Sequence, residues 1–427
     1  MQAPFFAADR AGTQGDFYLL VLAAVYHADG LWGEATYDLV PRVLPKGSDH
    51  LVVAGIEEAI DSALALSFSE EELDWLRGQA VFERASEGWL SSLEHLRFDG
   101  DIHAVPEGSL VFPDEPVLRV TAPLAQATLL HTRLVQALQA GTGIATRAAE
   151  LVRAAGPRRC FEFSSRSMPG QEAALLSARA AAVGGFEGTS NSLAASLLGI
   201  APMGTLSDDF FSVYPEVASA LEAFSVHFPD VGFVNLPRGT LAESVRQLAA
   251  YKELIRIVRL DHSRLGPASR KVRQALDAAG MEHTRILGTG SLTLEKLRAL
   301  GDAPVDMIGV GKGLAHAMHS VPFSYRIAEI WRGPDPEPCR TPGASRWPGV
   351  KQVWRYKDHD VIAPVDEDEH YDRGGQPLLR QVVREGERLL PRPAVQEARE
   401  RAALEYQALR EHLPGWSLKV SPRLEPT

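Results

Sequence analysis

The residues of this chain that are best suited to chemistry stand at the ends of short apolar runs. Asp261 lies at the end of the run IRIVRLDH, where its carboxylate could accept hydrogen bonds from ribose hydroxyls or bind Mg²⁺. Arg259 lies two residues earlier and would share one side of a strand with it, placed to contact a substrate or a phosphate. A buried ion pair between a strand and a helix explains the two residues equally well, so both interpretations stay open.

Two glycine-rich segments follow the last two apolar runs. Glycine lets backbone amides approach an anion closely, and in α/β barrels the last two loops commonly hold a phosphate. Either segment alone also suits a tight turn, but the pair favours phosphate binding. The predicted phosphate-binding residues are Gly288, Thr289, Gly290, Ser291, Gly309, Gly311, Lys312 and Gly313.

Further polar residues follow two earlier runs. Thr205, Ser207 and Asp208 come after GIAPM, and Ser164 and Arg166 come after RCFEF. These residues are candidates for substrate contacts and, for Asp208, for catalysis. The alternative for Asp208 is an N-cap of the next helix.

Two other groups are weaker candidates. His316 and His319 are three residues apart on a predicted helix, but no third ligand at a suitable spacing accompanies them, and no metal site is predicted from side chains. Phe17 and Tyr18 in GDFYLL are core residues unless a planar ligand stacks on them.

The elements that must position these residues alternate regularly from about residue 158. The strand candidates are RCFEFS, a run near GGFEGTSN, GIAPMGT, VGFVNL, IRIVRLDH, TRILGTG and VDMIGVG. Helical segments separate them, and this rhythm predicts parallel strands with crossover helices. Roughly seven such units without a Gly-x-Gly-x-x-Gly after the first strand favour a closed barrel over a doubly wound sheet. In a barrel the polar residues would meet at the C-terminal face.

The flanking parts predict an accessory α+β domain built from both chain ends. Residues 1–125 mix amphipathic helices with an antiparallel β-module at 98–123, residues 126–330 form the barrel domain, and residues 331–427 fold back onto the accessory domain.

Composition excludes several classes of protein. The formal charge of −11 argues against nucleic-acid binding, which needs a basic face. Two cysteines are too few for a disulfide framework, and no stretch is long and apolar enough to span a membrane. The N-terminus lacks a basic head followed by an apolar run, so a cytoplasmic enzyme is expected.

Several segments in order along the chain resemble the nicotinate phosphoribosyltransferases, a family of type II phosphoribosyltransferases. These segments are GDFYLLVLAAVY, GDIHAVPEGSLVFPDEPVLRV, FEFSSRSMPGQEAALLSARAAAVGGFEGTSN, GIAPMGTLSDDF, VRLDHS, IGVGKG, PGVKQVWR and EARERAALEYQALREHLP. The resemblance covers nearly the whole chain. It implies an α/β fold, a TIM-like seven-stranded barrel with an accessory domain, and a homodimer with sites across the subunit interface.

The resemblance also implies a reaction and roles. Such enzymes join nicotinate to phosphoribosyl pyrophosphate, forming a mononucleotide and pyrophosphate for NAD salvage, with Mg²⁺ expected and ATP hydrolysis coupled. Tyr18 would stack on the pyridine ring, and Arg166 would contact the carboxylate or a phosphate. Asp261 would help to hold the ribose, and the loops at 288–291 and 309–313 would hold its 5′-phosphate.

The departures from the family pattern fall in the sites. Asp208 stands where the family usually has a histidine that is phosphorylated when ATP is used, so ATP coupling is in doubt. The Arg-Arg pair is reduced to Arg166-Ser167, and Lys312 replaces a threonine. Three functions are therefore open: nicotinate phosphoribosyl transfer without ATP coupling, transfer to another base, and a non-catalytic nucleotide-binding relative. Asp208 would then form an acyl phosphate, hold Mg²⁺, or have no chemical role.

Overall fold

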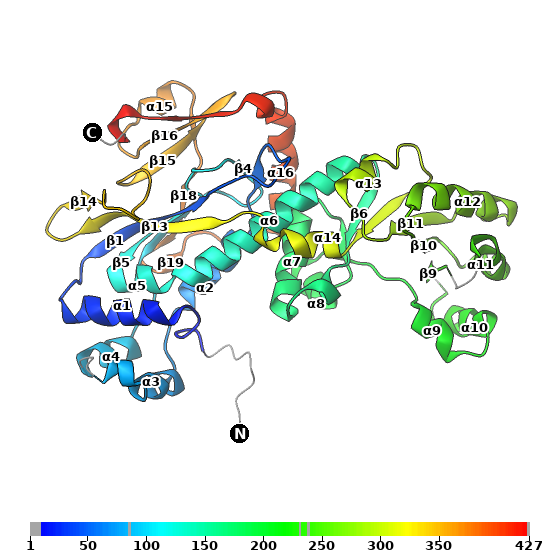
Figure 1. The fold of residues 1–427 in the computed structure, drawn as a ribbon, viewed down its shortest axis with the longest axis horizontal. Coiled ribbons are helices and arrows are strands. Elements are labelled where there is room, and N and C mark those ends of the chain that lie inside the picture. Colours follow the sequence, from blue (N-terminus) through cyan, green and yellow to red (C-terminus); the bar gives the residue numbers. More distant parts are fainter. Residues whose placement is uncertain (1–9, 84–86, 230–231, 237–239, 425–427) are drawn as a thin grey trace. The chain divides into compact units, whose positions relative to one another are not determined.

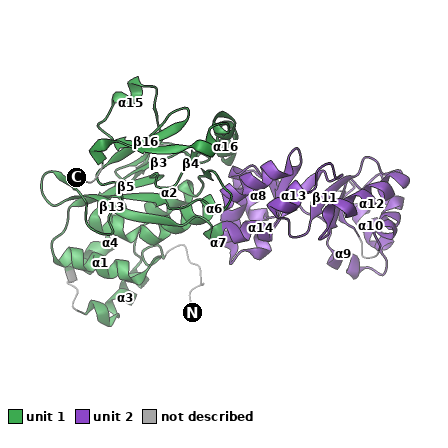
Figure 2. Ribbon diagram, turned by 45° about the horizontal axis from the view of Figure 1, so that its top comes forward, with its two compact units in different colours: residues 1–143, 318–427 green, residues 144–317 purple. Residues whose placement is uncertain are grey.

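A computed structural model describes residues 10–83, 87–229, 232–236 and 240–424 of the chain. These residues divide into two compact units (Figure 2), one formed by residues 1–143 with 318–427 and the other by residues 144–317. The first unit combines both ends of the chain, whereas the second is continuous in sequence.

A seven-stranded sheet, in the order β14-β13-β1-β5-β3-β18-β19, forms the centre of the first unit. Its longest pairing joins segments far apart in sequence, since Ala35 of β1 lies opposite Ile330 of β13 and the two strands are antiparallel. β3 and β5 also pair antiparallel, which confirms the β-module predicted at 98–123. The strands are β1 (Glu34–Pro41), β3 (Asp101–Ala104), β5 (Leu118–Pro123), β13 (Phe323–Trp331), β14 (Pro336–Pro338), β18 (Arg380–Arg384) and β19 (Glu387–Arg388).

Two smaller sheets complete the strands of this unit. The C-terminal part supplies a four-stranded sheet in the order β17-β15-β16-β20, and β2 pairs with β4. Their bounds are β2 (Leu51–Val52), β4 (Leu110–Val111), β15 (Lys351–Arg355), β16 (His359–Pro364), β17 (Gln376–Pro377) and β20 (Ser417–Val420).

Seven helices belong to the described part of the first unit (Figure 1). α3 begins at a capping box in which the Ser69 side chain accepts from the Glu72 amide and Glu72 bonds back to Ser69. The helices are α1 (Phe17–Ala28), α2 (Ile56–Leu64), α3 (Glu70–Arg77), α4 (Glu87–Glu94), α5 (Leu124–Leu129), α15 (Glu369–Asp372) and α16 (Val395–Leu409). α6 (His131–Ala155) begins in the first unit and ends in the second.

The second unit is built on a curled parallel sheet of seven strands in the order β8-β7-β6-β12-β11-β10-β9. Every strand expected from the alternating runs is present. The strands are β6 (Arg159–Glu162), β7 (Gly188–Thr189), β8 (Ala201–Pro202), β9 (Phe233–Asn235), β10 (Ile257–Asp261), β11 (Arg285–Thr289) and β12 (Met307–Val310). Leu206, just beyond edge strand β8, bridges Val234 of the opposite edge strand β9 in parallel.

Helices follow the strands of this unit as the crossover pattern requires. The helices are α7 (Gln171–Val183), α8 (Ser192–Leu198), α9 (Asp208–Val213), α10 (Val217–His227), α11 (Leu241–Leu248), α12 (Leu265–Ala278), α13 (Leu294–Arg298) and α14 (Lys312–Ala315).

The two-residue period of the strands separates an apolar end of the sheet's inner face from a polar one. Phe161, Ile257, Leu287 and Met307 form a buried cluster against which Phe163 packs. Because side chains two apart share a face, Arg259, Asp261, Thr289 and Gly309 follow on the same face toward the carboxyl ends of the strands. The apolar cluster therefore supports a polar layer above it.

Across the described residues, none of the helices has the length and apolar character that crossing a membrane requires.

Candidate active site

A pocket of about 700 Å³ lies at the carboxyl ends of the strands of the second unit. It brings together residues from five segments that the sequence had marked separately. The predicted residues that line it are Arg166, Thr205, Ser207, Arg259, Asp261, Thr289, Gly290, Ser291, Gly309, Gly311, Lys312 and Gly313.

Arg259, Asp261 and Thr289 form one hydrogen-bonded group on neighbouring strands. Arg259 donates from Nη2 to Asp261 Oδ2 at 3.2 Å and from Nε to Thr289 Oγ1 at 3.1 Å. The Thr289 hydroxyl in turn donates to Asp261 Oδ2 at 3.0 Å. The Asp261 side chain is 64% exposed, so this is not the buried strand–helix ion pair considered above. The group instead presents a fixed guanidinium and carboxylate to the pocket.

The loop after β11 needs glycine at one position. Gly290 has φ of +123°, and a Cβ there would lie 2.6 Å from the carbonyl oxygen of His262. Ser291 follows with φ of +51°, a left-handed conformation that side chains rarely adopt. The backbone thus turns sharply where the loop lines the pocket.

Gly309 makes room for an aromatic ring. A Cβ at this position would lie 2.5 Å from Phe163 Cε2 and 2.9 Å from the Thr289 methyl group. The Arg259 guanidinium lies 5.8 Å from the centre of the Phe163 ring. Glycine at 309 therefore lets the ring and Thr289 line the same pocket.

The charge of the lining is positive. Three cationic side chains, Arg166, Arg259 and Lys312, line the pocket together with one carboxylate, Asp261. For Arg166 and Lys312 the described residues supply neither a hydrogen bond nor an ion pair, so both cations are open to an anionic ligand. Cationic donors and close backbone are the features that phosphate groups require.

Three predicted residues of the same unit are placed away from the lining. Ser164 is buried, and its hydroxyl bonds Glu162 and the Ser177 hydroxyl of α7. A Cβ on Gly288 would lie 2.4 Å from Leu265 of α12. Asp208 is the first residue of α9.

Ser207, rather than Asp208, caps α9. The Ser207 hydroxyl accepts from the Phe210 amide at 3.3 Å. The N-cap interpretation of Asp208 is therefore wrong, although its carboxylate still lies in the first turn, where negative charge is favourable.

Phe17 and Tyr18 belong to the first unit, at the start of α1. Tyr18 is 51% exposed, and Phe17 packs its ring against Trp75 and Phe82. Tyr18 is thus more available to a ligand than Phe17.

Two important residues were missed from the sequence. Phe163 lines the pocket, and its signal was the alternation FEF, which puts it on the same face as Phe161. Glu162 lies on the opposite face and is fully buried. It accepts bonds from the Ser164 amide and hydroxyl and from Thr189 Oγ1 at 2.5 Å, which ties two pocket loops to the sheet.

Two family models match the chain in succession. Residues 13–139 match the N-terminal domain of nicotinate phosphoribosyltransferase, and residues 144–325 match the C-terminal domain of quinolinate phosphoribosyl transferase. The first match includes Phe17 and Tyr18, and the second includes all the other predicted site residues.

Curated relatives match over most of their length. The nicotinate phosphoribosyltransferase pncB2 of Mycobacterium tuberculosis is 31% identical over 92% of this chain and 86% of the relative. The nicotinate phosphoribosyltransferase of Bacillus subtilis is 29% identical over 85% of this chain and 78% of the relative.

Solved structures share the fold. Human nicotinic acid phosphoribosyltransferase superposes with a TM-score of 0.82 at 22% identity, covering 96% of this chain and 98% of that one. A nicotinate-nucleotide pyrophosphorylase from Pyrococcus furiosus superposes with a TM-score of 0.78 at 23% identity, and the match covers 96% of this chain and 99% of that one.

Proposed function

Because the chain belongs to the nicotinate phosphoribosyltransferase family, we propose that it transfers a phosphoribosyl group from phosphoribosyl pyrophosphate to nicotinate. The products are nicotinate mononucleotide and pyrophosphate, and the role is NAD salvage. The observation that carries the proposal is the pocket that Arg166, Arg259 and Lys312 line together with two glycine-rich loops.

The residues of the pocket suit this reaction. Displacing pyrophosphate from the anomeric carbon passes through a state in which positive charge develops on the ribose and negative charge on the leaving group. Positioning and charge therefore matter more than a nucleophile. Asp261 would hold the ribose hydroxyls, the loops at 288–291 and 309–313 would hold the 5′-phosphate, and Arg166 would meet the nicotinate carboxylate or a phosphate.

Mg²⁺ fits the donors present only as a substrate-bound ion. Among the described residues no group of three or more histidine, cysteine, aspartate or glutamate side chains is arranged to hold a metal. Mg²⁺ commonly uses one or two carboxylates together with substrate phosphates. Asp261 supplies such a carboxylate, and the ion would neutralise charge on the leaving pyrophosphate.

We further propose that transfer does not require ATP. Asp208 cannot form a phosphohistidine, and the pocket lining drawn from the described residues includes Ser207 but not Asp208. ATP remains a possible substrate only if Asp208 or another group takes the phosphate.

Three finer features belong to the same proposal. The Leu206–Val234 bridge supports closure of the parallel sheet into a TIM-like barrel. The exposed Tyr18 supports a homodimer in which this side chain stacks on the ring bound by a partner. The cytoplasmic location expected from the sequence stays a prediction.

Chromatography of product mixtures tests the proposal. The purified chain is incubated with phosphoribosyl pyrophosphate and Mg²⁺, and with nicotinate, nicotinamide or quinolinate, each with and without ATP. Nicotinate mononucleotide formed at equal rates with and without ATP is the expected result. ADP released in step with product would overturn the ATP-independent part. Product from another ring only, or from none, would overturn nicotinate as the acceptor.

A further inference from the structure

A second cavity, of about 600 Å³, lies within the first unit. It shares no lining residue with the pocket of the second unit. α16 supplies Arg401, Glu405 and Leu409, which are spaced four apart and so lie along one helix face. The other walls include the end of β15, the turn after it, β17, the start of β18 and the segment between β3 and β4. A cavity of this size falls within the range that holds small molecules in proteins.

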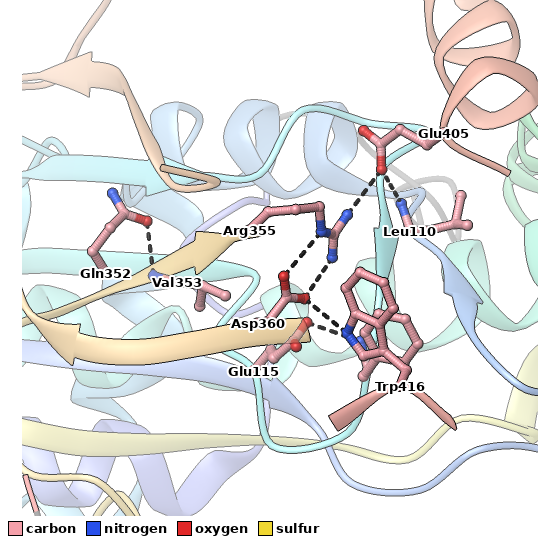
Figure 3. Close-up of polar contacts among 9 residues, drawn as sticks. Leu110, Glu115, Gln352, Val353, Arg355, Asp360, Glu405 and Trp416 are labelled. Carbon is pink, nitrogen blue, oxygen red and sulfur yellow. Dashed lines mark hydrogen bonds and ion pairs between the residues drawn. The ribbon is translucent and has the colours of Figure 1, made fainter. Parts of the chain in front are cut away.

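The carboxylate in this lining, that of Glu405, already has two donors. Arg355, at the end of β15, donates from Nε to Asp360 Oδ1 at 3.1 Å and from Nη2 to Asp360 Oδ2 at 2.7 Å (Figure 3). Its third nitrogen, Nη1, donates to Glu405 Oε2 at 3.0 Å, and the same oxygen accepts from the Leu110 amide at 2.8 Å. Glu405 is therefore engaged by a buried guanidinium and a backbone amide, and has little capacity to pair with another cation.

Three further cations line the cavity without a carboxylate partner. Arg401 donates from Nη1 to the carbonyl oxygen of Glu107. The side chains of Lys357 and Arg380 make neither a hydrogen bond nor an ion pair with any residue the structure describes. The Arg355 group carries one positive charge and two negative charges, those of Asp360 and Glu405, so its net charge is −1. The three further cations outweigh it and leave the cavity with a net positive charge. Cations gathered around one cavity attract an anion of more than one charge.

The lining also includes apolar side chains. Pro106, Pro377, Leu378 and Leu409 contribute to the cavity beside the cations. An inorganic anion would leave these side chains in contact with water, whereas a ligand with a ring would cover them. Arginine forks and lysine are suited to phosphate groups.

We propose that this cavity is a second ligand site, which binds a nucleoside phosphate. Its phosphates contact Lys357, Arg380 and Arg401, and its ring lies on the apolar side. The site goes beyond phosphoribosyl transfer and is independent of it, since every residue it uses lies outside the pocket assigned to that reaction.

Hydrogen exchange measured by mass spectrometry tests the site with ADP as the probe. The expected result is slower exchange in peptides that cover residues 374–382 and 398–409. Arg380→Glu should weaken ADP binding at this site about tenfold or more, because a charge-assisted contact becomes a repulsion. Lys357→Glu should act in the same direction and serves as a second variant if Arg380→Glu does not fold.

Arg384→Glu is the matched control, since Arg384 lies on the same strand, is exposed and contacts Gln381 rather than the cavity. Pyrophosphate and adenosine, used as separate probes, distinguish the phosphates from the ring, and each should bind more weakly than ADP. No protection of either peptide by ADP, or equal weakening by Arg380→Glu and Arg384→Glu, would overturn the proposal. Slower hydrogen exchange at residues 288–291 or 309–313 would report ADP binding in the pocket of the second unit and is scored separately. The second-site proposal and the phosphoribosyl-transfer proposal can therefore fail independently.

Discussion

Arg259 and Asp261 stand two residues apart on β10 and point to one face, where Nη2 of the arginine lies 3.2 Å from Oδ2 of the aspartate. Thr289 of β11 bonds both side chains. A guanidinium fixed in this way is ready to meet a negatively charged substrate without first losing side-chain freedom. Such preorganisation is the main source of charge stabilisation in active sites.

Arg259→Ala should therefore reduce kcat/KM for nicotinate-dependent transfer by about 10²–10³-fold, the loss typical of one preorganised donor. Steady-state kinetics with phosphoribosyl pyrophosphate as the varied substrate measures it. Arg270→Ala is the control, because Arg270 pairs with Asp302 on the surface of the same unit and should leave the rate unchanged. Equal rates for both variants would remove Arg259 from the site.

Gly309→Ala should impair the pocket although it adds only a methyl group. The new Cβ would press on the Phe163 ring and on Thr289, which pairs with Asp261. The value of kcat should fall and the KM for nicotinate should rise, so that kcat/KM falls by about tenfold or more.

Gly204→Ala is the matched comparison for that variant, since Gly204 also lines the pocket but a Cβ there meets nothing within 4 Å. Its kinetic constants should stay close to those of the unmodified chain. Comparable losses in the two variants would show that the effect is not one of crowding at Phe163.

Glu162→Gln should destabilise the fold by about 1–3 kcal/mol, because a buried amide replaces an acceptor that serves three donors. Urea unfolding followed by circular dichroism measures the change. Glu187→Gln is the control, since Glu187 forms a more exposed ion pair with Arg159 and should change stability by less than about 1 kcal/mol. A neutral Glu162→Gln would mean that the Ser164 and Thr189 loops are held by other contacts.

Glu115 makes stability depend on pH. Burial raises the pKa of Glu115 well above its ordinary value of 4.5, and the neighbouring Asp360 carboxylate raises it further, against the opposing charge of Arg355. The folded chain keeps this proton where the unfolded chain has released it, so this contribution to stability is complete at low pH. It is lost progressively as the pH rises toward the folded pKa.

Glu115→Gln keeps a neutral side chain at every pH. Measured between about pH 5 and about pH 9, its stability relative to the unmodified chain should rise with pH until the folded pKa of Glu115 is passed. Urea unfolding across this range gives the slope. Glu411→Gln is the control, since Glu411 is exposed, and this variant should leave the pH dependence of stability unchanged. A relative stability of Glu115→Gln that does not change over this range would show that Glu115 is ionised in the folded chain.

Much of the second unit could be predicted because its local signals agree. Each short apolar run ended by glycine or a polar residue became a strand, even where β7 and β8 are only two residues long. The same runs placed most pocket residues, since parallel strands present their carboxyl ends together.

The parts that were missed depend on spatial neighbours. Phe163 looks like a core residue until Gly309 is seen to make room for it beside the pocket. Ser207 and Asp208 are both good N-caps by type, and only backbone geometry decides between them. The cavity beside α16 joins Lys357, Arg380 and Arg401, whose separation in sequence gives no local signal.

The most direct test of phosphoribosyl transfer follows pyrophosphate by phosphorus NMR. The chain is mixed with phosphoribosyl pyrophosphate and Mg²⁺, with and without nicotinate, beside the Arg259→Ala variant. Pyrophosphate should appear only when nicotinate is present, and ATP should not be needed. With the variant the rate of its formation should be lower by about 10²–10³-fold. No nicotinate-dependent pyrophosphate, or an undiminished rate with Arg259→Ala, would contradict transfer in the pocket of the second unit.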